Sequence, residues 1–100
     1  IYVVVRNDLT PSQVAVQSSH ACIESARHYL QEDSRHPHLV LVKVKNELRL
    51  TKLIDELNHH GIKFRNFIEP DLNYTLTALA TEPIQADSPI RGFFKRFSLY

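Results

Sequence analysis

Hydrophobic and polar residues form two kinds of pattern along this chain. Short runs rich in β-branched and aromatic residues, such as IYVVVR at 1–6, predict strands. That first run is apolar at nearly every position, which suits a strand buried on both faces. Apolar residues three and four positions apart predict helices between the strands. The expected elements are strands at 1–6, 39–44, 62–68 and 74–81, long helices at 11–31 and 47–60, and a short helix at 89–93.

Residues with known end preferences stand where the helices are expected to begin and end. Thr10 is a suitable N-cap for the first helix, with Pro11 at its first position and Gln13 three residues after the cap. Asn46 can cap the second helix, and Gly61 can end it in a left-handed conformation. For the short third helix, we expect a cap at Asp87 or Ser88.

The order of the elements predicts the architecture. The two long helices act as crossovers, which makes some neighbouring strands parallel. The link at 69–73 is so short that it favours an antiparallel hairpin. We therefore expect one α/β domain, residues 1–100, with a mixed four-stranded sheet flanked by helices on both faces, in the order β-α-β-α-β-β-α.

Composition narrows the class of protein. The apolar fraction of 43% and the charged fraction of 23% are ordinary for a globular domain. No apolar run approaches the roughly 20 residues of a membrane-spanning helix, so no membrane partner is expected. The single cysteine, Cys22, excludes an internal disulfide and fits a reducing compartment such as the cytoplasm. Because the chain starts directly on a strand without methionine, we expect the native start upstream of Ile1.

Two basic neighbourhoods interrupt an otherwise balanced chain of net charge +1. One is RGFFKR at 91–96, and the other contains Lys43, Lys45, Arg49 and Lys52. Either cluster alone is typical of a solvated face. If the two meet in space, however, they are suited to contact phosphates.

A polar stripe runs along the first helix. Gln13, Gln17, His20 and Glu24 follow one another at steps of three or four, beside the apolar stripe. His20 could shuttle a proton, with Glu24 orienting its imidazole. The alternative is a border histidine satisfied by Glu24 or by a backbone carbonyl.

The loop at 69–73 follows a predicted strand, where open α/β sheets often bind ligands. Its carboxylates Glu69 and Asp71, with Thr75 and Thr77 beyond, could bind a water or a ribose hydroxyl. The alternative is a turn in which Asp71 and Asn73 cap backbone groups. The remaining histidines match no zinc spacing, so neither a metal nor a cofactor is expected.

Two stretches of the chain resemble a known family. The run VVVRNDLTPSQVAVQSSHA is similar to the start of the type 2 peptidyl-tRNA hydrolases, which have a valine-rich strand, an Arg-x-Asp-Leu turn and a helix carrying Ala-x-Gln-x-x-His-Ala. The matching residues are Arg6, Asp8, Leu9, Ala15, Gln17, His20 and Ala21. The stretch GIKFRNFIEPDLNYTLTALAT resembles the second signature, with Asp71 as the loop aspartate and Thr77 opening the last strand.

The resemblance implies hydrolysis of the ester between peptide and tRNA. Asp71 would orient or deprotonate the water, with His20 on a shared hollow, while Thr77 and Gln17 position the substrate. Gln13, Asn73 and Thr75 would also line the substrate site. The tRNA backbone would lie on five cations: Lys43, Lys45, Arg91, Lys95 and Arg96. Family members commonly form homodimers, although the phenylalanines at 93, 94 and 97 are better suited to the core.

The chain departs from the family at the start of the first helix. The family's lysine falls at Gln13, and loss of one electrostatic contact commonly costs about 10²–10³ in rate. Two alternatives therefore stay open: an inactive family member that binds RNA or protein, and a domain that binds a small molecule.

Overall fold

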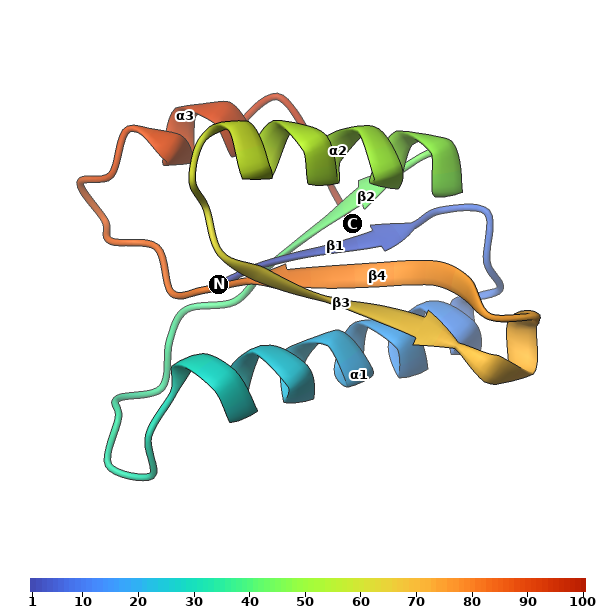
Figure 1. Cartoon of the computed structure of the whole chain (residues 1–100), viewed down its shortest axis with the longest axis horizontal. Helices are drawn as coiled ribbons and strands as arrows, with labels where there is room; N and C mark the ends of the chain where they lie inside the picture. The colour runs from blue at the N-terminus through green and yellow to red at the C-terminus, as the bar shows by residue number, and fades with distance from the viewer.

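A five-stranded mixed sheet forms the middle layer of the molecule, with helices on both of its faces (Figure 1). The computed structural model describes residues 1–100. The strands are β1 (Tyr2–Arg6), β2 (Val40–Val44), β3 (Phe64–Glu69), β4 (Thr75–Thr81) and β5 (Ser98–Leu99). The helices are α1 (Pro11–Tyr29), α2 (Glu47–His59) and α3 (Ile90–Phe94), and a short 3-10 turn, η1 (Pro70–Leu72), joins β3 to β4.

The strand order is β3-β4-β1-β2-β5. β1 is parallel to β2 and antiparallel to β4, and β3 and β4 form the expected antiparallel hairpin. The predicted α/β architecture is confirmed, but the predicted count of four strands is wrong. The fifth strand pairs Ser98 and Leu99 with Lys43 and Val42. A two-residue edge strand is defined by its partner and leaves no alternating pattern of its own.

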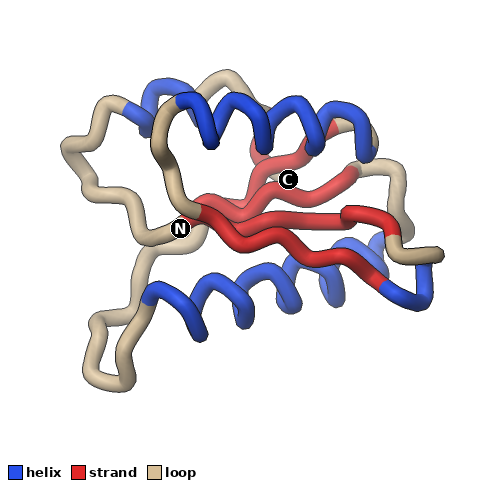
Figure 2. The backbone as a smooth tube through the Cα atoms, in the orientation of Figure 1, coloured by secondary structure: helices blue, strands red, loops and turns tan.

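α1 covers one face of the sheet, and α2 and α3 cover the other (Figures 1 and 2). On the α2 side, Val4 of β1 and Leu79 of β4 pack in one core with the buried leucines of α2. On the α1 side, Val3 and Val5 pack in a second core with Ala21 of the helix. β1 is therefore buried on both faces, as its apolar run predicts.

Most of the predicted helix ends are confirmed. Thr10 and Gln13 form a capping box, in which the Gln13 amide N–H donates to Thr10 Oγ1 at 3.2 Å and the Thr10 amide donates to Gln13 Oε1 at 2.9 Å. Asn46 Oδ1 accepts from the Arg49 amide, and Gly61 has a φ of +69° just beyond α2. In α3 the N-cap position is Pro89 rather than Asp87 or Ser88, although Ser88 Oγ accepts from the Ile90 amide at 3.4 Å.

The C-terminal aromatic residues complete the core on the α2 side. Phe94 is 1% exposed, and its ring stacks on Tyr2 of β1 with centroids 4.1 Å apart. Phe93 and Phe97 pack edge-on to one another at its border. None of the helices combines the length and apolar character needed to cross a membrane.

Candidate functional site

A chain of hydrogen bonds joins α1 to β3 and β4. Thr77 Oγ1 donates to Gln17 Oε1 at 2.6 Å, and Gln17 Nε2 donates to Glu69 Oε1 at 2.9 Å. Thr77 is 0% exposed and Gln17 is 3% exposed, so both polar groups are satisfied away from solvent. The Gln17 amide is thereby held in one orientation, and Glu69 lies at the solvent end of this series of hydrogen bonds.

Local sequence explains why these three side chains converge. Gln17 lies on the buried face of α1, in the same helical row as Val14 and Ala21. Thr77 faces α1 from β4, and Glu69 is the last residue of β3. The helical spacing predicts Gln17 at the border of the apolar stripe, but the structure buries it because Thr77 supplies a partner. Glu69 was expected in a loop, since the predicted strand ends at residue 68.

His20 is held by stacking. Its ring lies 4.3 Å from the ring of Phe67 with an interplanar angle of 2°, and the residue is half-buried. Glu24 does not orient it, because that carboxylate faces Arg27 at 3.5 Å and His28 at 3.9 Å. The expectation of a Glu24–His20 contact is therefore wrong, and the aromatic ring contributed by β3 replaces it.

Two adjoining hollows flank the turn between β3 and β4. The helix hollow, between the start of α1 and the turn, is lined by Ser12, Gln13, Val16, Gln17, Glu69, Asp71 and Leu72. The turn hollow, on the other side of the turn, is lined by Arg6, Leu9, Pro70, Asp71, Leu72, Asn73 and Thr75. Asp71 is exposed and belongs to both hollows, so it stands at their common rim. His20 lines neither of them, so a hollow that it shares with Asp71 stays a prediction.

The turn is shaped by its own side chains. Asn73 and Tyr74 have φ values of +63° and +58°, in the left-handed region. Thr75 Oγ1 donates to the Leu72 carbonyl at 2.8 Å, which uses its proton to close the turn. The predicted substrate residues Asn73 and Thr75 thus lie together beside Asp71, and both also serve the turn.

Arg6 is the one cation that lines either hollow, and three of its five N–H donors are used within the chain. Nε and Nη2 each donate to Asp8 at 2.9 Å, and Nη1 donates to the Leu76 carbonyl at 3.1 Å. The hydrogen bonds with Asp8 raise the pKa of Arg6, and those with Arg6 lower the pKa of Asp8. Neither hollow therefore contains a cation that lacks a partner in the chain.

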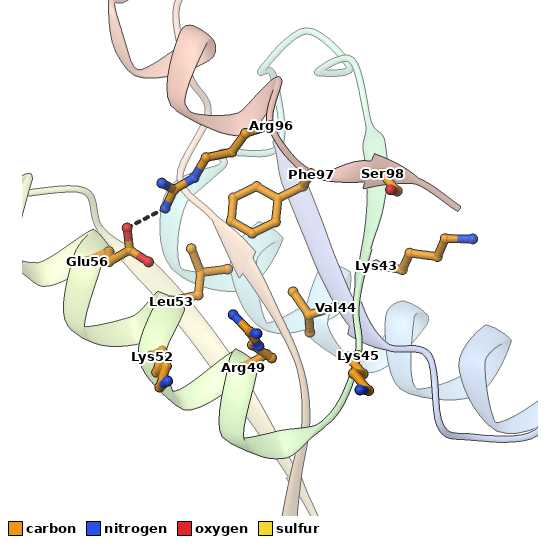
Figure 3. A pocket seen from close by; sticks show the side chains of 10 residues that line it. All are labelled: Lys43, Val44, Lys45, Arg49, Lys52, Leu53, Glu56, Arg96, Phe97 and Ser98. Carbon is orange, nitrogen blue, oxygen red and sulfur yellow. Dashed lines mark hydrogen bonds and ion pairs between the residues drawn. The ribbon is translucent and has the colours of Figure 1, made fainter.

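The two basic neighbourhoods meet on the α2 side of the sheet. Five cations line a single hollow, which we call the basic hollow: Lys43, Lys45, Arg49, Lys52 and Arg96. The Lys43 side chain points away from the other four (Figure 3). They come from β2 and the residue after it, from α2 and from the segment that leads into β5. Arg91 does not join them, because it lines a separate hollow and donates to the Ala86 carbonyl. Lys95 is exposed and lies outside the basic hollow.

Comparison with known protein families gives a match over the whole chain. The family model described as "Peptidyl-tRNA hydrolase PTH2" matches residues 1–100. No individual curated protein gives a significant match.

Proposed function

Because this chain belongs to the peptidyl-tRNA hydrolase PTH2 family over residues 1–100, we propose that it hydrolyses the ester that joins a peptide to tRNA. The observation that carries the proposal is the Thr77–Gln17–Glu69 chain beside the exposed carboxylate of Asp71. Ester hydrolysis requires a positioned water, a group that accepts its proton and donors that stabilise the oxyanion.

The side chains at the helix hollow can supply these parts. Asp71 accepts the proton of the attacking water. Glu69 uses one oxygen to hold Gln17, which leaves its other oxygen to position that water. Gln13 accepts from the Thr10 amide through its oxygen, so its Nε2 is a neutral donor in the first turn of α1. This amide takes the place of the family's lysine, and we expect a lower rate as a result.

His20 stays a candidate proton carrier rather than a placed one. It lies almost one helical turn after Gln17 on α1, stacked on Phe67. His20→Gln tests this part. A variant that cleaves peptidyl-tRNA at the native rate at every pH from about 5 to 8 would remove the residue from proton transfer.

The test is cleavage of a defined peptidyl-tRNA by purified protein, using Asp71→Asn and Glu69→Gln. Asp87→Asn, an exposed acid outside both hollows, is the matched control. Asp71→Asn is expected to lower kcat by about 10²–10⁴, the usual contribution of a general base, while the control retains full activity. Native protein that leaves the substrate intact, when free of contaminating hydrolase, would overturn the enzymatic proposal.

The second candidate is a family member that binds peptidyl-tRNA without cleaving it. It is favoured by two observations: Arg6 is already ion-paired with Asp8 and bonded to the Leu76 carbonyl, and no lysine stands at position 13. Gln13→Lys discriminates between the two. If the native chain is inactive and this variant is active, the native chain is a derived non-enzyme.

Location and assembly belong to the same proposal. Peptidyl-tRNA arises where translation occurs, so the cytoplasm is the expected compartment. The predicted homodimer is tested by light scattering during size-exclusion chromatography, where a monomer mass across the accessible concentration range would contradict it.

A further inference from the structure

The basic hollow has an excess of positive charge that the fold does not neutralise. Its lining includes five cations and one carboxylate, Glu56. Glu56 pairs with Arg96, and no other ion pair involves a cation of this hollow. Lys45, Arg49 and Lys52 are all exposed. A concentration of unpaired cations in a concave surface attracts a polyanion and raises its local concentration.

The cations surround an apolar floor rather than standing on a flat face. Figure 3 shows Val44, Leu53 and Phe97 in the centre, with Lys45, Arg49 and Lys52 on one side and Arg96 on the other. The hollow has a volume of about 530 Å³, and it lies between α2 and the β2–β5 edge.

Aromatic rings hold two of the cations in place. The guanidinium carbon of Arg96 lies 4.2 Å from the Phe93 ring centroid and 5.3 Å from that of Phe97. At the rim, Lys43 Nζ lies 5.5 Å from the centroid of the Tyr100 ring. Contacts of this kind orient a side chain without neutralising its charge. Arg96 is thus held in one position, with its guanidinium paired to Glu56 of α2.

The basic hollow and the candidate active site lie at the same edge of the sheet. β1 and β2 are parallel and Arg6 is paired with Val44, so both strands end at the same edge of the sheet. Arg6 lines the turn hollow beside Asp71, while Val44 and Lys45 line the basic hollow. The helix hollow lies on the α1 face and the basic hollow on the α2 face, and β3 and β2 are three strand spacings apart, or roughly 14 Å.

We propose that the basic hollow binds the phosphate backbone of RNA, with Arg49 and Lys52 as principal contacts, and that the bound strand crosses this sheet edge toward Asp71. The choice of RNA over another polyanion rests on the proposed function. The charge, the shape and the position of the hollow do not depend on that function.

The experiment measures binding of uncharged tRNA, which has no ester to cleave, by fluorescence anisotropy over a range of salt concentrations. Arg49→Gln/Lys52→Gln is compared with Lys63→Gln/Arg65→Gln, which removes the same charge from exposed positions at β3. Circular dichroism and thermal unfolding establish that both variants fold. Each phosphate contact contributes about 0.7–0.9 to the slope of log K against log salt.

The α2 double variant is expected to bind tRNA about tenfold or more weakly, with a salt slope smaller by about 1.5, while the β3 double variant binds as the native protein does. Equal losses in the two variants, or no loss in the α2 variant, would overturn the proposal. Competition by inorganic phosphate at low millimolar concentration would also overturn it, because a site for one free phosphate is not a backbone groove. If polyglutamate binds as tightly as tRNA with the same dependence on Arg49 and Lys52, the choice of RNA is wrong.

A separate outcome concerns the proposed function. If native protein binds tRNA through Arg49 and Lys52 but leaves peptidyl-tRNA intact, the proposal for the basic hollow is supported and the hydrolase proposal fails. If native protein cleaves peptidyl-tRNA and the α2 variant does so with unchanged KM, the hydrolase proposal is supported and the proposal for the basic hollow fails.

Discussion

Thr77 and Gln17 share a 2.6 Å hydrogen bond across 60 residues of sequence, in the dry layer between β4 and α1. Through this bond, a strand in the second half of the chain sets the orientation of a side chain on the first helix. Because Gln17 in turn holds Glu69, the contact links core packing to the geometry of the helix hollow.

Replacing Thr77 by valine tests this link. The substitution keeps the branched shape but removes the donor, and it leaves Gln17 Oε1 buried without its partner. We expect a loss of about 1–3 kcal/mol in the free energy of unfolding, measured by urea denaturation. Thr51→Val, on the exposed face of α2, is the control and should change stability by less than about 0.5 kcal/mol. Equal effects of the two substitutions would show that the buried hydrogen bond has no special weight.

Phe94 should be one of the most costly side chains to truncate. It is 1% exposed and stacks on Tyr2, so Phe94→Ala leaves a cavity against β1. The expected loss is about 3–5 kcal/mol, measured by thermal or urea unfolding. Leu48→Ala, at a side chain that is 62% exposed, is the control for an apolar truncation. A loss below about 1 kcal/mol for Phe94→Ala would contradict the packing described for α3.

The Arg6–Asp8 pair predicts a specific pH dependence of stability. The pKa of Asp8 is lowered from its ordinary value of 3.8 by its hydrogen bonds with Arg6. A carboxyl with a depressed pKa stabilises the fold above its unfolded pKa, and this contribution disappears as pH falls through the folded pKa. Because the Asp8 side chain is 41% exposed, solvent screening limits the effect to about 1 kcal/mol or less.

Asp8→Asn isolates this contribution. The variant should be less stable than the native protein at pH 7, and the difference should disappear as pH falls through the lowered pKa of folded Asp8. Unfolding free energies measured from pH 7 to pH 2 check both statements. A difference that stays constant over the whole range would mean that the charge of Asp8 is not its cause.

Cys22 is expected to react slowly with thiol reagents. It is half-buried against the core on the α1 side, and burial raises the pKa of its thiol. The thiolate is the reactive form, so a raised pKa and restricted access both lower the rate. Modification near pH 7.5 should be much slower in the folded protein than in urea. Equal rates would show that the α1 side opens readily.

Sequence patterns predicted the features that depend on neighbouring residues. The caps of α1 and α2 were predicted correctly because Thr10, Gln13 and Asn46 act within one helical turn. The burial of β1 followed from its own uninterrupted apolar run. These features need no knowledge of what packs against them.

Contacts between distant segments could not be obtained in the same way. Spacing along α1 brought Glu24 within reach of His20, but Phe67 of β3 occupies the imidazole face instead. The two basic clusters were visible in the sequence, but their meeting depends on β5 pairing with β2. The contact of Glu69 with Gln17 could not be predicted, because one further residue of β3 carries that carboxylate out of the expected loop.

The position of β1 in the sheet has a consequence for the order in which the chain acquires its structure during synthesis. β1 lies between β2 and β4, and the Tyr2 amide bonds to the side chain of Thr81, 79 residues away. A nascent chain that has emerged from the ribosome only as far as α2 still lacks half of the partners of its most apolar strand. We therefore expect such a chain to need protection from aggregation until the β3–β4 hairpin has emerged.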